Sequence, residues 1–146
     1  MASGTRVDFY VLHATGVASR LNFACRLTEK AYALDHRVYA HVASPDEARQ
    51  LNELLWTFKP GSFIPHGQLG TGLAEKSPVT IGMPEAWQNE GDLLINLSAA
   101  APSFATNFAR VAEIVDGSEE SRAAGRSRFR QYREMGLAPE THVIER

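Results

Sequence analysis

Residues 7–42 contain two short apolar segments separated by a long amphipathic one. Residues 7–12 and 37–42 are rich in β-branched and aromatic side chains, which predicts a strand at each place. Between residues 17 and 34, apolar side chains recur at intervals of three and four, which predicts a helix with one buried face. A strand, a helix and a strand in succession form the right-handed unit of parallel sheets. This segment therefore restricts the chain to an α/β fold.

The next segment begins with a clear signal for a helix start. Ser44 is a favourable N-cap residue, Pro45 fits the first helical turn, and Glu47 completes a capping box. We expect this helix to continue as far as Trp56.

Three further segments predict strands: residues 78–82, 92–97 and 111–115. Residues 92–97 form the most apolar of these segments, so we expect that strand at the centre of the sheet. A last helix should begin with Asp116 or Ser118 as its cap and run to about Met135. Gly136 is expected to end it.

The remaining segments are shorter and less regular. We expect residues 67–77 to form a glycine-containing loop, residues 104–108 a short helix, and the tail 137–146 an extended segment. No repeat or low-complexity tract interrupts the sequence. We therefore expect a single domain spanning residues 1–146, folded as a three-layer α/β/α sandwich with a mostly parallel sheet of Rossmann-like topology.

Composition excludes several classes of protein. A length of 146 residues with 44% hydrophobic side chains is enough for one buried core. The net charge of −2 disfavours a non-specific nucleic-acid binder, which is usually basic. Cys25 is the only cysteine, so no internal disulfide can form. No apolar run approaches the roughly 18 residues of a membrane span, and we expect a cytoplasmic protein without a membrane partner.

A search for catalytic motifs finds no convincing set. No phosphate-binding loop or nucleophile elbow is present, and the segment after the first predicted strand has the single glycine Gly16. No histidine has metal-ligand spacing to another ligand residue, and Cys25 should be an inert core thiol. Asp8, inside the first strand, has no partner that the sequence reveals. We expect no catalytic residues, metal, cofactor or nucleotide site.

Aromatic side chains gather around a predicted turn at Pro60 and Gly61. Trp56 precedes the turn, and Phe63 and Pro65 follow it. One interpretation is that the rings cover the end of the helix and belong to the core. The other is that they form an exposed patch that a partner protein covers, since aromatic residues are enriched at interface hot spots.

The last predicted helix concentrates arginines on one face. Arg122, Arg126, Arg130 and Arg133 are spaced four, four and three residues apart, and Phe129 lies beside them. One interpretation is a solvated face with the ring directed into the core. The other is an anion-binding groove for a phosphate backbone or for an acidic peptide with an apolar end. The net charge of the chain favours the peptide.

Three segments resemble the chi subunit of bacterial DNA polymerase III. They are residues 7–12, the pair 51–56 and 62–66 with its Leu-Trp and Ser-Phe-Ile-Pro-His motifs, and residues 126–133 followed by Gly136. The resemblance extends over nearly the whole chain. It implies a non-catalytic accessory subunit of the clamp-loader assembly.

The resemblance also implies two partners. One is the psi subunit, for which Trp56, Phe63 and Pro65 match the contact patch. The other is the acidic, phenylalanine-ending C-terminal tail of single-stranded DNA-binding protein. The matching tail-site residues are Val115, Arg122, Arg126, Phe129, Arg130 and Arg133. Phe129 stands where the family pattern leads us to expect tyrosine. Contact with DNA would be mainly indirect, through the tail-bearing partner.

Two other functions remain open at this stage. The first is a small nucleotide-dependent enzyme, because open α/β folds often bind nucleotides. The second is direct binding of single-stranded DNA by the arginine-rich helix.

Overall fold

The computed structural model describes residues 4–58, 65–68, 78–82 and 91–144, and their strands form one parallel sheet. The seven strands are β1 (Arg6–Val11), β2 (Val38–His41), β3 (His66–Gln68), β4 (Val79–Gly82), β5 (Gly91–Asn96), β6 (Phe108–Val115) and β7 (Glu140–Val143). Their order is β3-β4-β2-β5-β6-β1-β7, and every neighbouring pair is parallel. The predicted α/β class is confirmed, and β5 lies in the middle of the sheet as expected.

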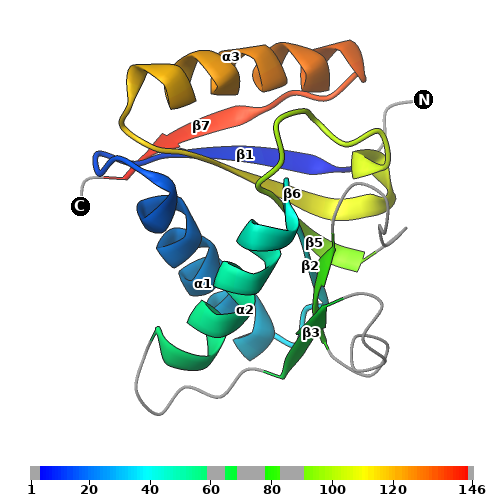
Figure 1. Ribbon diagram of the computed structural model, residues 1–146. Helices are drawn as coiled ribbons and strands as arrows, with labels where there is room; N and C mark the ends of the chain where they lie inside the picture. Colours follow the sequence, from blue (N-terminus) through cyan, green and yellow to red (C-terminus); the bar gives the residue numbers. More distant parts are fainter. Residues whose placement is uncertain (1–3, 59–64, 69–77, 83–90, 145–146) are drawn as a thin grey trace.

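Helices cover both faces of the sheet. Helices α1 (Val17–Ala33) and α2 (Pro45–Thr57) pack together on one face, and α3 (Glu119–Glu134) lies on the other (Figure 1). Strand β6 shows why two cores form. Ala112 and Ile114 pack in the core under α1 and α2, whereas Val111 and Val115 pack in the core under α3. The predicted three-layer sandwich is confirmed.

Side-chain caps mark where α2 and α3 begin, whereas α1 begins after Gly16 without one. Ser44 accepts a hydrogen bond from the Glu47 N–H at 3.2 Å, with Pro45 in the first turn of α2, so the predicted N-cap is confirmed. The Glu47 side chain does not complete a capping box, because its buried Oε1 has no hydrogen-bond partner among the described residues. Of the two candidate caps for α3, Ser118 is the N-cap, and its hydroxyl accepts from the Ser121 N–H at 3.1 Å. Asp116 supports it by accepting from the Ser118 N–H at 2.7 Å.

The end of α3 needs a left-handed residue. Gly136 has φ 87°, a conformation that glycine adopts at little cost. The predicted end of the last helix is therefore confirmed. The described helices include none that is long and apolar enough to cross a membrane.

Two of the described strands, β3 and β7, were not predicted. Residues 66–68 form β3 at one edge of the sheet, where the expected loop would already have begun at Gly67. The tail is not merely extended, because β7 pairs with β1 at the opposite edge. Both strands are too short to show an alternating pattern in the sequence. Each forms because its main chain pairs with a neighbouring strand, β4 for β3 and β1 for β7. The rest of the expected loop, residues 69–77, lies outside the described residues.

A buried polar network joins α3 to the sheet. Glu113 of β6 is 0% exposed, and its carboxylate accepts hydrogen bonds from Arg128 at 2.7 Å and from Tyr132 at 2.6 Å. Asn96 of β5 donates a third at 2.6 Å. Burial raises the pKa of Glu113, and the nearby Arg128 guanidinium opposes that shift. Arg128 thus faces inward, unlike the other arginines of the helix.

Removing the arginine should leave a buried carboxylate without its counter-charge. We expect Arg128→Ala to lower the free energy of unfolding by about 3–5 kcal/mol, the usual cost of breaking a buried pair from one side. Urea unfolding followed by circular dichroism measures this change.

Arg130→Ala is the matched control, because Arg130 lies on the same helix but is exposed. It should change the free energy of unfolding by no more than about 0.5 kcal/mol. Equal effects of the two substitutions would contradict a structural role for the buried pair.

Candidate functional site

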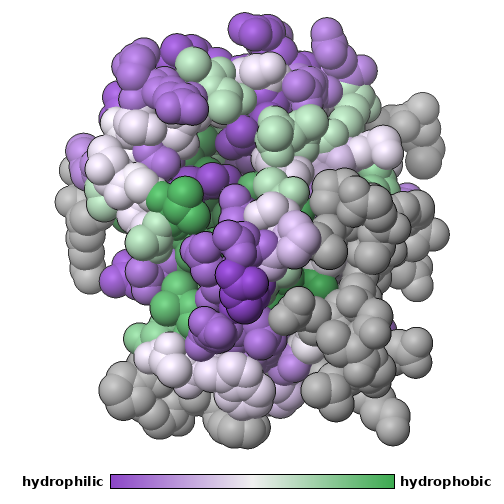
Figure 2. Space-filling view, in the orientation of Figure 1, coloured by the Kyte–Doolittle hydropathy of each residue, from purple (hydrophilic) through white to green (hydrophobic). Residues whose placement is uncertain are grey.

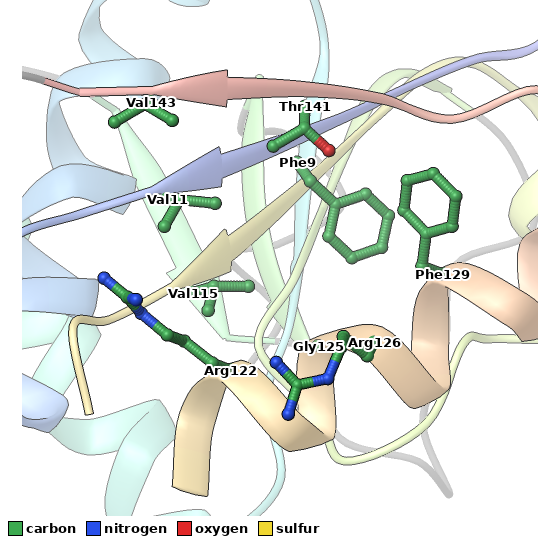
Figure 3. A pocket seen from close by; sticks show the side chains of 9 residues that line it. All are labelled: Phe9, Val11, Val115, Arg122, Gly125, Arg126, Phe129, Thr141 and Val143. Carbon is green, nitrogen blue, oxygen red and sulfur yellow. The ribbon is translucent and has the colours of Figure 1, made fainter. Parts of the chain in front are cut away.

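An open groove runs between α3 and the strands beneath it (Figure 3). Its volume is about 310 Å³. Strands β1, β6 and β7 form its floor and one wall, and α3 forms the other wall. The lining residues are Phe9, Val11, Val115, Arg122, Gly125, Arg126, Phe129, Thr141 and Val143.

The groove has an apolar floor and a basic rim. Phe9 and Phe129 bring their rings to a centroid distance of 5.2 Å at one end. Arg122 and Arg126 are exposed, and they extend from α3 at the side of the groove (Figure 3). Hydrophilic side chains also dominate the outer surface over α3, along the top of Figure 2. The site therefore suits a ligand with an apolar group and a negative charge.

A glycine allows α3 to approach the sheet at this point. A Cβ atom at Gly125 would lie 2.7 Å from Cγ2 of Val115, closer than real Cβ atoms come to other heavy atoms. Glycine is otherwise unfavourable inside a helix by about 1 kcal/mol relative to alanine. Its position in α3 thus follows from the close packing of the groove wall on β6.

The structure brings together four of the six residues predicted for the tail site. Val115, Arg122, Arg126 and Phe129 all line the groove. Arg130 and Arg133 are exposed on the same helix but are not among the lining residues. Arg126 also lies 3.7 Å from Glu119, in a pair whose side chains are 63% and 86% exposed, so the contact is weak.

Other lining residues were not predicted. Phe9 and Val11 alternate with Asp8 and Tyr10 along β1, so the alternating pattern could have placed them on one face with Val7. Thr141 and Val143 belong to β7, for which no strand was predicted. Their role depends on pairing between the two ends of the chain, which carries no local signal.

Asp8 connects β1 to β7 through its side chain, in addition to the main-chain pairing of the two strands. The sequence revealed no partner for this residue. The buried Asp8 carboxylate lies 2.8 Å from His142 Nε2, 3.0 Å from Arg110 Nη2 and 3.2 Å from Arg6 Nε. Burial alone would raise the pKa of Asp8. Hydrogen bonds from these three side chains outweigh burial and hold the pKa below its ordinary value. Asp8 thus has three partners among the described residues, none of which the sequence alone revealed.

The predicted aromatic patch is only partly described. Trp56 is 48% exposed at the end of α2, and its ring lies 4.5 Å from that of His66. His66 Nε2 is 3.0 Å from the Asn52 carbonyl oxygen, which suits a structural histidine. Pro65 is half-buried, and Phe63 lies outside the described residues. In this part of the chain, Phe58 packs against the core while Trp56 faces solvent.

Within the described residues, no group of three or more histidine, cysteine, aspartate or glutamate side chains could hold a metal ion. Cys25 is fully buried, and burial raises the pKa of its thiol to about 12. Such a thiol is not reactive at neutral pH.

Comparison with known proteins identifies the family. The profile of the family described as "DNA polymerase III chi subunit, HolC" matches residues 4–140. The chain belongs to this family. A protein from Pseudomonas aeruginosa named DNA polymerase III subunit chi is 43% identical over 145 residues, covering 97% of this chain and 99% of the relative. Chi subunits of Escherichia coli and Haemophilus influenzae are 28% and 26% identical, each over 88% of this chain and 91% and 90% of their own.

Two solved structures from outside the chi family have a fold similar to that of this chain. The crystal structure of T4 UvsW superposes on 97% of this chain with a TM-score of 0.71, at 9% identity, over 42% of its own length. A structure of Saccharomyces cerevisiae Dbp5 bound to Gle1 superposes on 100% of this chain with a TM-score of 0.65, at 10% identity, over 43% of its length. At such low identity the likeness shows the fold alone.

Asp8 with Arg6, Arg110 and His142 forms a group that we call the Asp8 cluster. Because of this cluster, we expect the pairing of β7 with β1 to weaken at acidic pH. Since the pKa of Asp8 is lowered on folding, its stabilising contribution is present above the ordinary carboxyl range and is lost as pH falls through the lowered pKa. We expect Asp8→Asn to reduce stability at pH 7 and to make stability less dependent on pH between about 5 and 2. Urea unfolding across this range measures both effects.

Asp46→Asn is the control, because Asp46 is 69% exposed and pairs with Arg49 at the surface. Because Asp46 lies in the first turn of α2, the change should lower stability at pH 7 by no more than about 1 kcal/mol, and it should alter the pH dependence much less than Asp8→Asn does. Asp8→Asn should also accelerate amide exchange of His142 and Ile144, next to β1. Unchanged exchange there would show that the cluster does not hold β7 in place.

Proposed function

We propose that the chain is a non-catalytic accessory subunit of DNA polymerase III in DNA replication. It connects the clamp loader, through the psi subunit, to the C-terminal tail of single-stranded DNA-binding protein. The observation that carries this proposal is the groove beside α3, in which an apolar slot meets two arginines. Membership in the chi family supports the placement in the polymerase assembly.

The groove matches an acidic peptide that ends in phenylalanine. Phe9, Val115 and Phe129 supply the apolar surface that a phenyl ring requires. Arg122 and Arg126 supply guanidinium groups, which pair well with the carboxylates of the tail. Arg130 and Arg133 continue the charged face along α3, where they can contact acidic residues farther from the end of the peptide.

The second proposed surface contains Trp56 and Pro65, to which the sequence adds Phe63 outside the described residues, and we assign it to the psi subunit. Trp56 lies on α2, and α2 and α3 cover opposite faces of the sheet (Figure 1). Two partners can therefore bind without overlapping. An exposed tryptophan that packs on a histidine is a suitable anchor, because interface hot spots are enriched in tryptophan.

In open α/β folds, ligands such as nucleotides usually bind at the carboxyl ends of the strands. The residues at that place in this chain do not favour a nucleotide-dependent enzyme. The crevice at the carboxyl ends of the strands contains Glu47, Asp116 and Glu120, which disfavour phosphate groups. Its Arg20 donates to the main-chain oxygens of Ile114 at 3.2 Å and Leu97 at 3.3 Å. The guanidinium group of Arg20 therefore has a structural role in binding these main-chain oxygens.

Tail binding tests the proposal directly. We expect Arg126→Ala to weaken binding of an acidic, phenylalanine-terminated peptide by about 1–3 kcal/mol, the range for hydrogen bonds to charged groups. Amidating the C-terminus of the peptide should cost a similar amount, since it removes the carboxylate. Higher salt should weaken binding steadily because the arginines are exposed. Calorimetry at low and moderate salt measures all three effects.

Arg26→Ala on α1 removes an exposed arginine from the other face of the sheet and should leave peptide binding unchanged. Equal affinity of wild type and Arg126→Ala for the peptide would disprove the tail site. Tighter binding of single-stranded DNA than of the peptide, lost in Arg126→Ala, would favour the direct DNA-binding function instead.

The psi surface is tested by Trp56→Ala. We expect this change to weaken co-purification with the psi subunit and to leave the circular dichroism spectrum and peptide binding intact, because Trp56 is 48% exposed. Leu55→Ala is the comparison, since Leu55 is buried beside it and its truncation should lower stability by about 2–5 kcal/mol. If Trp56→Ala unfolds the protein as Leu55→Ala does, the ring belongs to the core.

A further inference from the structure

Strand β7 is both a wall of the groove and an edge of the sheet. The strand order ends at β7, and β1 is its one neighbour among the described strands. We propose that the bound tail pairs with this edge, so that the residues preceding its terminal phenylalanine add to the sheet as a further strand. This inference rests on the proposed tail-binding function and specifies how the peptide is held.

The register of β7 shows which of its main-chain groups are available. The Ile144 N–H donates to the Val11 carbonyl oxygen at 2.9 Å, so it points toward β1. Main-chain groups alternate in direction along a strand, and His142 and Glu140 therefore also face β1. Thr141 and Val143 face the other way. Each offers one N–H and one C=O at the open edge.

The same two residues have their side chains in the groove. Thr141 and Val143 line it together with Phe9 and Val11 of the adjacent strand (Figure 3). A strand added beside β7 would lie about 4.8 Å away, with alternate side chains on this same face of the sheet. One of those side chains can then enter the apolar slot while the main chain pairs with the edge. Pockets and main-chain pairing cooperate in this way when peptides bind by strand addition.

Main-chain pairing at this edge is not blocked within the strand itself. Edge strands are protected by lysine, proline, a bulge, charged side chains or short length. Strand β7 is short and carries Glu140, but it contains no lysine or proline and pairs with β1 in unbroken register. Val143 is instead an apolar residue that is 57% exposed. The occupant that fits is an extended acidic peptide, because Arg122 and Arg126 make the neighbouring rim positive.

A scan of N-methylated peptides tests the pairing. Each amide of the residues preceding the terminal phenylalanine is methylated in turn, and affinity for the full chain is measured by calorimetry. Strand addition predicts an alternating pattern, because only every second amide faces β7. Methylation at those positions should weaken binding roughly five- to tenfold, equivalent to one hydrogen bond, and methylation at the intervening positions should have little effect.

Amide hydrogen exchange gives a second, independent result. The N–H groups of Thr141 and Val143 should exchange more slowly when the unmodified peptide is bound. The N–H of His142 serves as the internal control, since it already faces β1 and should change less. Val143→Pro compared with Val143→Ala offers a third test. Both changes remove the valine side chain from the groove, but only proline removes the outward N–H, and neither removes a bond to β1, so Val143→Pro should weaken peptide binding more than Val143→Ala.

The outcomes separate this inference from the function on which it rests. If the unmodified peptide binds and depends on Arg126, but methylation shows no alternation and Thr141 and Val143 gain no protection, strand addition is wrong and the tail site stands. If the unmodified peptide does not bind at all, the proposed function fails, and strand addition fails with it.

Discussion

The buried contact between Glu113 and Arg128 determines how α3 sits on the sheet. A carboxylate at 0% exposure must be paired, and here it receives hydrogen bonds from Arg128, Tyr132 and Asn96. Two of these donors belong to α3. Any rotation of the helix about its axis would withdraw both and leave the charge unpaired. The network thus fixes which residues of α3 face the groove.

Because of the helical periodicity, neighbouring residues of α3 lie in different environments. Gly125, Arg128 and Tyr132 are buried against the sheet, whereas Arg122 and Arg126 are exposed at the rim. Because Gly125 has no side chain, the helix can approach Val115 closely, and Phe129 then contacts Phe9 across the groove. A helix rich in arginine therefore combines a buried anchor with a basic rim, and the distinction rests on position within the turn.

The sequence alone predicted what depends on local pattern. The first strand–helix–strand unit and the Ser44 cap follow from spacing and capping chemistry, and so does the shared helical face of Arg122, Arg126 and Phe129. The same spacing does not show that Arg130 and Arg133 lie outside the groove or that Gly125 lines it. The sequence did not distinguish Arg128 as a buried residue, because its partner Glu113 lies on another element. It also missed β7 and the partners of Asp8, since His142 is 134 residues away along the chain. Contacts of this kind are set by tertiary pairing, which residue spacing does not encode.

The groove is consequently a product of the whole fold rather than of α3. Its floor comes from β1 and β6 and its far wall from β7, so both ends of the chain must pair before the slot exists. The Asp8 cluster secures that pairing from the opposite face of the sheet, where His142 also stacks on Tyr10 at 5.4 Å. Side chains that never contact a ligand in the groove thus maintain its wall. An isolated α3 peptide would keep the arginines but lose the apolar slot, and with it the combination of apolar floor and basic rim on which the proposed ligand depends.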